Sequence, residues 1–316
     1  MPELNEEITK QTPNGFLNIY KPSGYTSHDV VAVLRRHLPR KSKVGHTGTL
    51  DPEATGVLPV CLGKATRLAE YFGALPKTYV GELTLGSATS TYDKWGEVTK
   101  TAEAEKLSVI SERDIGAVLP RFMGRIQQVP PMMSAVKIAG QKLYKLARAG
   151  IEIERPPRSV QIFSINIHSI SLPKIELAVC CSGGTYIRSL FNDIGEALGV
   201  YGHLSSLERT AVGDFRAENA VKLADAEGML AAGDYTSILP MNAGIAHLPL
   251  IELQDKRDFD HAIHGREVVL GLSEAEAPAC RVMYEGELVG IGETRYEAQG
   301  CACNEMLLLH MDKVLL

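Results

Sequence analysis

Alternating apolar and polar residues near the front of the chain predict a strand that leads into a helix. Residues 15–21 alternate between the two classes and stop at the turn-forming triplet Pro22-Ser23-Gly24. Apolar residues then recur at helical spacing up to Pro39, and Ser27 is a candidate N-cap for that helix. The apolar positions of the predicted helix are Val30, Val31, Val33, Leu34 and Leu38.

The same alternation predicts a strand over residues 78–85. Tyr79, Leu83 and Leu85 share one face of it, so Tyr79 is expected to be a core aromatic residue. Residues 91–96 are typical of a turn.

Three further elements are predicted in the middle of the chain. Residues 141–148 form a predicted short helix that ends at Gly150, and residues 175–181 form a predicted strand. Residues 182–185 lead this strand into a helix that ends at Gly199. The core face of that helix consists of Ile187, Leu190, Phe191, Ile194 and Leu198.

A new apolar pattern begins near residue 245. Residues 248–253, 265–270 and 288–292 are typical of short strands between turns. We therefore expect a flexible polar N-terminus over 1–12, a main domain over 13–244 and a small β-rich domain over 245–316.

The composition is that of an ordinary soluble protein. Of 316 residues, 45% are hydrophobic and 22% charged. There is no run of about 18 apolar residues, and the first residues resemble no secretory signal, so a cytoplasmic protein without membrane contact is expected. The six cysteines are predicted to be reduced thiols; Cys301 and Cys303 could bind a soft metal but lack partner ligands, so no metal site is predicted.

The net charge of −5 hides an uneven distribution. From residue 217 onward there are about 17 acidic and 7 basic residues, which leaves a basic front part. Such asymmetry is what a localised phosphate-binding surface requires. Between residues 121 and 158 the charges are almost all positive, and this segment is the best candidate for an RNA-contacting surface, although a solvated helix face would have the same charges.

The candidate chemistry lies in the glycine-rich stretch over residues 43–63. Gly45, Gly48 and Gly56 permit tight backbone turns, and Pro52 restrains the residue before it, so Asp51 is a carboxylate on a constrained loop. The alternative is structural: Asp51 could be the N-cap of a helix that starts at Pro52.

Arg188 is expected in the first turn of the helix that follows residue 185. A cation there opposes the helix dipole, so a compensating anion is expected, and Asp51 is the obvious candidate. The alternative is an ordinary exposed arginine.

Several motifs together resemble the TruB family of tRNA pseudouridine synthases. The run GHTGTLDPEATGVLP over residues 45–59 resembles the family's catalytic loop, and TYDKWG over 91–96 fits a second family pattern. VPPMMSA over 129–135 and CSGGTYIR over 181–188 match two more. The resemblance implies an α+β pseudouridine synthase fold: a central mixed, mainly antiparallel sheet flanked by helices, a basic thumb over about 124–155, and a small PUA-like C-terminal domain.

The resemblance also implies roles for individual residues. Asp51 matches the nucleophile, Arg188 its ion-pair partner, and Tyr186 a residue that helps hold the substrate. Tyr79 and Leu207 match residues that pack against the target base, and Tyr79 could also relay a proton. His46 matches a residue that fills the space left by extruded nucleotides. The alternatives for His46 are a general base and a histidine that is only hydrogen-bonded within the loop. The candidate RNA-binding residues are Lys43, Lys64, Lys137, Lys142 and Arg148.

Two features depart from the family pattern. Glu208 stands where a basic residue is usual, and the C-terminal domain is acidic, which makes its contribution to RNA binding doubtful.

The activity implied is isomerisation of uridine to pseudouridine at position 55, in the T-loop of tRNA. A carboxylate suits this reaction because it acts without a metal or redox group, so no cofactor is expected. The expected partner is the T-arm stem-loop, bound by a monomer. A nucleoside hydrolase and a non-catalytic tRNA chaperone are the alternatives.

Overall fold

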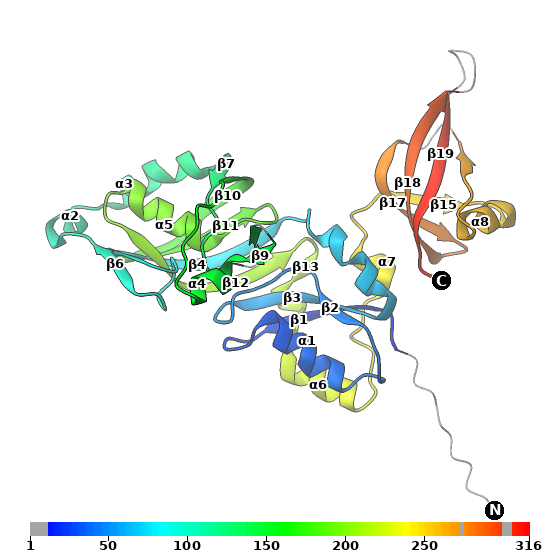
Figure 1. Cartoon of the computed structure of the whole chain (residues 1–316), viewed down its shortest axis with the longest axis horizontal. Coiled ribbons are helices and arrows are strands. Elements are labelled where there is room, and N and C mark those ends of the chain that lie inside the picture. The colour runs from blue at the N-terminus through cyan, green and yellow to red at the C-terminus, as the bar shows by residue number, and fades with distance from the viewer. Residues whose placement is uncertain (1–11, 135, 139, 272–274, 299–304) are drawn as a thin grey trace, which may run out of the picture.

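The structure is a computed structural model that describes residues 12–134, 136–138, 140–271, 275–298 and 305–316. Most of the predicted flexible N-terminus and the pair Cys301 and Cys303 lie outside these residues. The chain forms a larger body of sheet and helices and a smaller β-rich body near the C-terminus (Figure 1).

One large sheet forms the centre of the larger body. Its strands lie in the order β14 (Val221–Lys222), β1 (Gly15–Lys21), β3 (Thr55–Leu62), β12 (Gly202–Val212), β4 (Lys77–Leu85), β11 (Lys174–Cys181), β10 (Arg158–Ser171) and β7 (Gly124–Gln128). β2 (Val44–His46) pairs with β3, and β13 (Phe215–Arg216) pairs with β12. The β1–β14 and β3–β12 pairs are parallel and the others antiparallel, so the predicted mixed, mainly antiparallel sheet is confirmed.

Helices cover the sheet in two groups. α1 (Ser27–Arg36) and α6 (Leu223–Ala231) pack on β1 and β3 through a cluster that includes Leu17, Leu34 and Leu58. α5 (Ile187–Ala197), α3 (Glu112–Val118) and the 3₁₀ helix η2 (Leu119–Phe122) pack on β4 and β11. The odd residues of β4 are buried, and Tyr79, Leu83 and Leu85 belong to this second cluster, as their alternation predicts.

The N-cap of α1 is Thr26, so the prediction of Ser27 was wrong by one residue. The Thr26 hydroxyl accepts from the backbone N–H of Asp29, and the Asp29 carboxylate accepts from the backbone N–H of Thr26. Ser27 is buried instead, where its hydroxyl accepts from the backbone N–H of Leu50 at 2.8 Å. The start of α1 is thereby tied to the residue that precedes Asp51.

The predicted small β-rich domain forms a second sheet. Its order is β15 (Leu250–Leu253), β17 (Ala277–Tyr284), β18 (Glu287–Ala298), β19 (Glu305–Val314) and β16 (Val268–Leu270), with α8 (Lys256–Ile263) against it. The strand predicted over 288–292 is only part of the longer β18. The sheet contacts the 3₁₀ helix η1 (Gly63–Phe72) of the larger body, where the Lys313 ammonium lies 2.7 Å from the Glu70 carboxylate.

The other elements are short. They are β5 (Ser87–Thr89), β6 (Val98–Thr101), α2 (Ala104–Ser108), β8 (Lys137–Ile138), β9 (Gln141–Lys142), α4 (Leu143–Arg148), η3 (Ala217–Asn219) and α7 (Met241–Gly244). The helix predicted over 141–148 therefore begins two residues later, because Gln141 and Lys142 pair with β8.

Candidate active site

Asp51 lies in the loop between β2 and β3 and caps no helix. The backbone N–H of Ala54 donates to the Asp51 carbonyl at 3.1 Å, which closes a single turn. Thr55 then pairs with Glu208 of β12, so the chain extends into β3 instead of continuing as a helix. The interpretation of Asp51 as a helix N-cap is therefore wrong.

Gly56 is the glycine of this loop whose conformation requires glycine. Its φ is +102°, and a Cβ atom there would lie 2.2 Å from the backbone oxygen of Arg209. Gly45 and Gly48 do not adopt positive φ, so of the three glycines only Gly56 needs the backbone freedom of glycine. The close approach at Gly56 fixes the end of the Asp51 loop against β12.

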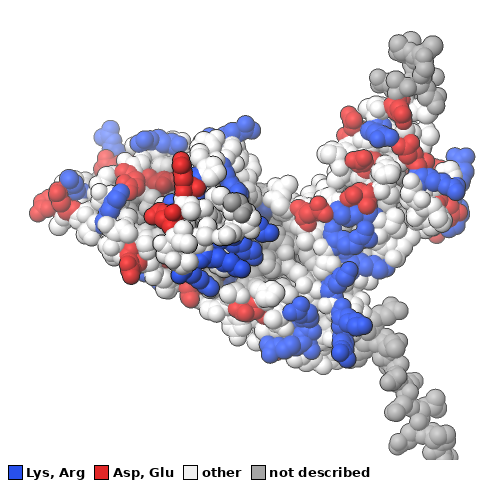
Figure 2. All heavy atoms as spheres, in the orientation of Figure 1, with Lys and Arg blue, Asp and Glu red and all other residues white. Residues whose placement is uncertain are grey.

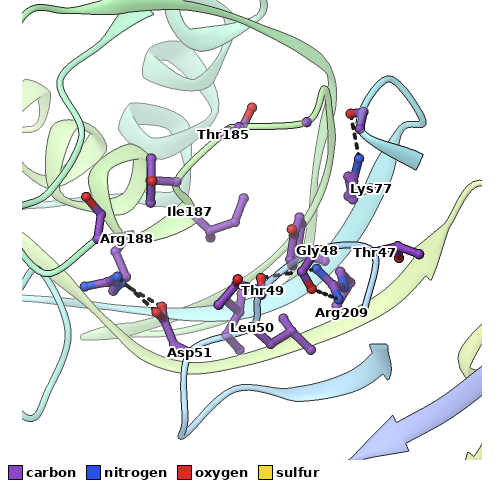
Figure 3. A pocket seen from close by; sticks show the side chains of 17 residues that line it. Thr47, Gly48, Thr49, Leu50, Asp51, Lys77, Thr185, Ile187, Arg188 and Arg209 are labelled. Carbon is purple, nitrogen blue, oxygen red and sulfur yellow. Dashed lines mark hydrogen bonds and ion pairs between the residues drawn. The ribbon is translucent and has the colours of Figure 1, made fainter. Parts of the chain in front are cut away.

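Arg188 and Asp51 form the predicted ion pair. Arg188 Nε lies 2.9 Å from Asp51 Oδ2, and Arg188 Nη2 donates to Asp51 Oδ1 at 3.1 Å, so both carboxylate oxygens are held. The two side chains face each other across one end of the cavity in Figure 3. The Arg188 side chain is 5% exposed, whereas that of Asp51 is 43% exposed, so the carboxylate remains accessible to a substrate.

Arg188 also joins the Asp51 loop to two other segments. It donates to the carbonyls of Thr91 and Met133 at 3.1 and 2.8 Å, and its Nη1 lies 3.5 Å from the Asp93 carboxylate. Met133 belongs to the predicted thumb, and Asp93 to the turn over 91–96. Asp93 was not among the predicted site residues, although the motif over 91–96 contained it.

A cavity of about 300 Å³ opens beside the ion pair. Tyr79, Tyr186 and Leu207 line it together with Asp51 and Arg188, so the structure brings five of the predicted residues to one place. They come from β4, the N-terminal end of α5, β12 and the glycine-rich loop. Tyr186 is fixed by Gln128, whose side-chain amide exchanges two hydrogen bonds with the Tyr186 backbone.

Tyr79 is both a core residue and part of the cavity wall. Its side chain is almost wholly buried. Burial raises the pKa of the Tyr79 phenol, although the charge of Arg209 acts in the opposite direction. The phenol is therefore neutral at ordinary pH, and it presents an uncharged ring to the cavity.

Two cations at the cavity were not predicted as site residues. Arg209 is buried and donates to the carbonyls of Val57 and Gly48 at 2.7 and 3.1 Å, which holds the loop on both sides of Asp51. Figure 3 shows Arg209 beside Gly48, with Lys77 farther along the cavity. Lys77 donates to the carbonyls of Phe72, Gly73 and Leu75, and burial lowers the pKa of its ammonium to about 8.

Lys21, at the end of β1, supports the Asp51 loop from outside the cavity. Its ammonium donates to the carbonyls of Pro22, Tyr25 and Pro52 at 2.7 to 2.8 Å. Sequence patterns gave no sign of it, because a charged residue at a strand end is normally exposed.

His46 is not part of this cavity. It lies in β2, paired with Val60 of β3, and its buried Nδ1 has no hydrogen-bond partner among the described residues. Burial lowers the pKa of the imidazole, which favours the neutral ring. Its predicted role toward extruded nucleotides remains a prediction.

The predicted RNA-binding residues lie in two places, all of them exposed. Lys137, Lys142 and Arg148 belong to the thumb, where Lys142 and Arg148 lie 5.7 and 5.6 Å from the ring centre of Tyr144. Lys43 and Lys64 are neighbours across the backbone hydrogen bond from Gly63 to Lys43. Figure 2 shows lysine and arginine gathered over the region of α4 and again near α1.

Comparison with known proteins places the chain in a family. Residues 35–187 match the model described as the TruB family pseudouridylate synthase N-terminal domain, and residues 188–245 match the tRNA pseudouridylate synthase B C-terminal domain. The chain belongs to the TruB family of pseudouridylate synthases. It is therefore an enzyme of the isomerase class, which decides against the hydrolase and the chaperone.

Individual relatives are similar to this chain over most of its length. It is 45% identical to tRNA pseudouridine synthase B of Listeria monocytogenes, over 77% of this chain and 81% of the relative. It is 45% identical to tRNA pseudouridine synthase B of Dechloromonas aromatica, over 89% and 91% of the two chains. A solved structure of an H/ACA RNP bound to a substrate RNA containing 2′-deoxyuridine has a TM-score of 0.69 and 27% identity, over 96% of this chain and 85% of the other.

Two further observations concern membrane-spanning helices and metal-binding clusters. No helix within the described ranges is long and apolar enough to cross a membrane. The same residues contain no group of three or more histidine, cysteine, aspartate or glutamate side chains that could hold a metal ion.

The site predicts how the rate of this TruB-family enzyme depends on pH. Desolvation raises the pKa of the Asp51 carboxyl, while the Arg188 guanidinium acts in the opposite direction. As the pH falls through that raised pKa, Asp51 takes up a proton and loses its charge. On the prediction that the charged Asp51 carboxylate is the nucleophile, the single-turnover rate, measured from about pH 8 downward, is expected to fall with a midpoint above the ordinary aspartate value of about 4. A midpoint at or below that value would contradict the proposed environment of Asp51.

Proposed function

We propose that this chain converts uridine to pseudouridine at position 55 in the T-loop of tRNA, with Asp51 as the nucleophile. The observation that carries the proposal is the accessible Asp51 carboxylate, held by Arg188 at the wall of a cavity that also contains Tyr79 and Leu207. Such a cavity suits a single uracil ring.

The reaction breaks the bond between uracil N1 and the sugar and joins uracil C5 to the same sugar carbon. N1 gains a proton and C5 loses one, so the product is an isomer of the substrate. A carboxylate forms a covalent intermediate, or balances positive charge on the sugar, without a metal or redox group. Arg188 aims the carboxylate through one hydrogen bond and one close ion-pair contact, and it favours the charged form of Asp51.

The aromatic and apolar walls hold the base while it turns. The neutral ring of Tyr79 and the side chain of Leu207 pack against the uracil, and Tyr186 supports it from the start of α5. The Tyr79 phenol keeps its proton at ordinary pH, so we assign Tyr79 to packing against the base.

A tRNA substrate is supported by the names of the relatives and by the basic surfaces. The Listeria and Dechloromonas proteins are both tRNA pseudouridine synthases B. The exposed Lys137, Lys142 and Arg148 supply positive charge on the thumb, from which Met133 also contacts Arg188. The target uridine must leave the base stack to reach Asp51, at a cost of a few kcal/mol that phosphate contacts can offset.

A T-arm stem-loop whose only uridine occupies the target position tests the proposal. Incubated with wild-type protein and no cofactor, its uridine is expected to be recovered as pseudouridine. Free uracil in place of pseudouridine would contradict isomerisation, and an unchanged uridine in a bound stem-loop would contradict the T-loop as target.

The thumb is expected to bind phosphates. Replacing Lys137, Lys142 and Arg148 by Gln should weaken tRNA binding and reduce the slope of log affinity against log salt concentration by about 2 to 3. Binding is measured as a salt titration. The matched control replaces Lys256, Arg257 and Arg266, three exposed cations of the C-terminal domain, by Gln. Equal slopes for the two triple variants would contradict a thumb-specific contact.

A further inference from the structure

A second cavity of about 360 Å³ also borders the ion pair. It shares Asp51, Arg188 and Leu207 with the first cavity. Its remaining walls are mostly apolar: Pro52, Ala54, Met133, Leu204 and the indole of Trp95, with Glu53, Thr91 and Asp93 as the polar lining. The ion pair therefore borders two adjoining compartments, of which the proposed uridine site needs only one.

We infer that the second cavity receives the base of a nucleotide adjacent to the target uridine, stacked on Trp95. The inference rests on the proposed function and adds a specificity-determining residue to it. Consecutive nucleotides are covalently joined, so a target base in the first cavity holds its neighbour within one backbone unit of the second. The shared walls make the two compartments continuous.

Trp95 is presented at this cavity by a rigid turn. The backbone N–H of Trp95 donates to the Asp93 carboxylate at 3.2 Å, and the backbone N–H of Lys94 donates to the Leu204 carbonyl of β12 at 2.9 Å. Gly96 closes the turn by donating to the Asp93 carbonyl at 3.2 Å. Asp93 is itself held near Arg188, so the position of the indole is coupled to that of the catalytic pair.

The exposure of the indole fits a stacking platform. Trp95 is 52% exposed although it lines a cavity, which leaves aromatic surface free for a ligand. A single exposed aromatic residue on a plain surface would need no explanation. One that borders the catalytic pair is different, because stacking on an aromatic ring is how proteins hold unpaired bases.

The charges around the cavity favour a base inside it and a phosphate outside. The three carboxylates of Asp51, Glu53 and Asp93 outnumber the one cation of the lining, Arg188, so the net charge of the cavity is negative and would repel a phosphate. The exposed Lys94 ammonium lies 4.7 Å from the centre of the indole ring, where it can meet the phosphate of the same nucleotide. When an uncharged base stacks on the indole, it avoids repulsion by the acidic lining, and its phosphate can lie near Lys94.

The fluorescence of Trp95 gives a direct test, because it is the single tryptophan of the chain. The Asp51→Asn variant is titrated with three T-arm stem-loops: the intact one and two that lack a base on the 5′ or the 3′ side of the target uridine. Stacking is expected to quench the fluorescence with the intact stem-loop, and one of the two abasic stem-loops should bind without quenching. Binding without quenching by the intact stem-loop, or equal quenching by all three, would overturn the inference.

Kinetics give a second test. Trp95→Ala is expected to lower kcat/KM for the intact stem-loop by about 5- to 150-fold, the range for loss of one base–aromatic stack, and Trp95→Phe should recover most of the loss. With the abasic stem-loop identified by fluorescence, wild type and Trp95→Ala should react at similar rates. Equal loss on both stem-loops would show that Trp95 acts only through the fold.

The two tests separate this inference from the proposed function. If wild-type protein makes no pseudouridine, the proposed function fails whatever Trp95 does. If pseudouridine forms but the fluorescence is insensitive to both missing bases, only the role of Trp95 fails.

Discussion

Replacing Asp51 by Asn is expected to lower the single-turnover rate of pseudouridine formation by about 10⁴- to 10⁶-fold. This is the range seen when other enzymes lose a nucleophile or another residue that acts directly in the chemical step. The amide preserves the size of the side chain but removes the charge that attacks or stabilises the sugar. The oxygen of the introduced amide can still accept one hydrogen bond from Arg188, so the fold should be retained.

Binding of tRNA to the Asp51→Asn variant should be close to that of wild type, because the predicted phosphate contacts lie elsewhere on the surface. Glu97→Gln, the same change at an exposed carboxylate, is the matched control and should leave the rate unchanged. Turnover by Asp51→Asn within about tenfold of wild type would exclude Asp51 as the nucleophile.

Replacing Arg188 by Lys is expected to lower the rate by about 10²- to 10³-fold, comparable to the loss of one oriented donor in other active sites. A lysine keeps the positive charge but not the planar fork, so it cannot hold both Asp51 oxygens and the carbonyls of Thr91 and Met133 at once. The single-turnover rate and the melting temperature should be measured together.

The two measurements distinguish a role of Arg188 in orienting Asp51 from a role in stabilising the fold. Arg113→Lys on α3 is the control, because Arg113 is exposed. A rate for Arg188→Lys equal to that of wild type would remove the ion pair from the mechanism. A rate loss that is matched by extensive unfolding would assign Arg188 a structural role alone.

Hydrophobic periodicity was sufficient to predict two of the elements that carry the site, β4 and α5. The alternation over 78–85 predicted β4 with Tyr79 on its buried face, and the dipole argument at the start of α5 predicted a partner for Arg188. Those inferences depend on spacing along one element, which a sequence displays directly.

Apart from the pair of Arg188 and Asp51, contacts between distant segments were not predicted. Lys21 reaches the carbonyl of Pro52, and Arg209 reaches that of Gly48, only because β1, β3 and β12 are neighbours in the sheet. The N-cap of α1 was misplaced for a related reason: Thr26 and Ser27 are both good caps, and the hydrogen bond to Leu50 decides between them. Asp51 was open to interpretation as a cap because local sequence alone does not show that Thr55 enters the sheet.

The most direct test of the account is to incubate wild-type protein and Asp51→Asn with a full-length unmodified tRNA transcript, with no cofactor added, and to map pseudouridine chemically at every uridine. The account predicts one modified position with wild type, the T-loop uridine at position 55, and none with Asp51→Asn. Modification of a uridine outside the T-loop, or the same product from both proteins, would contradict it.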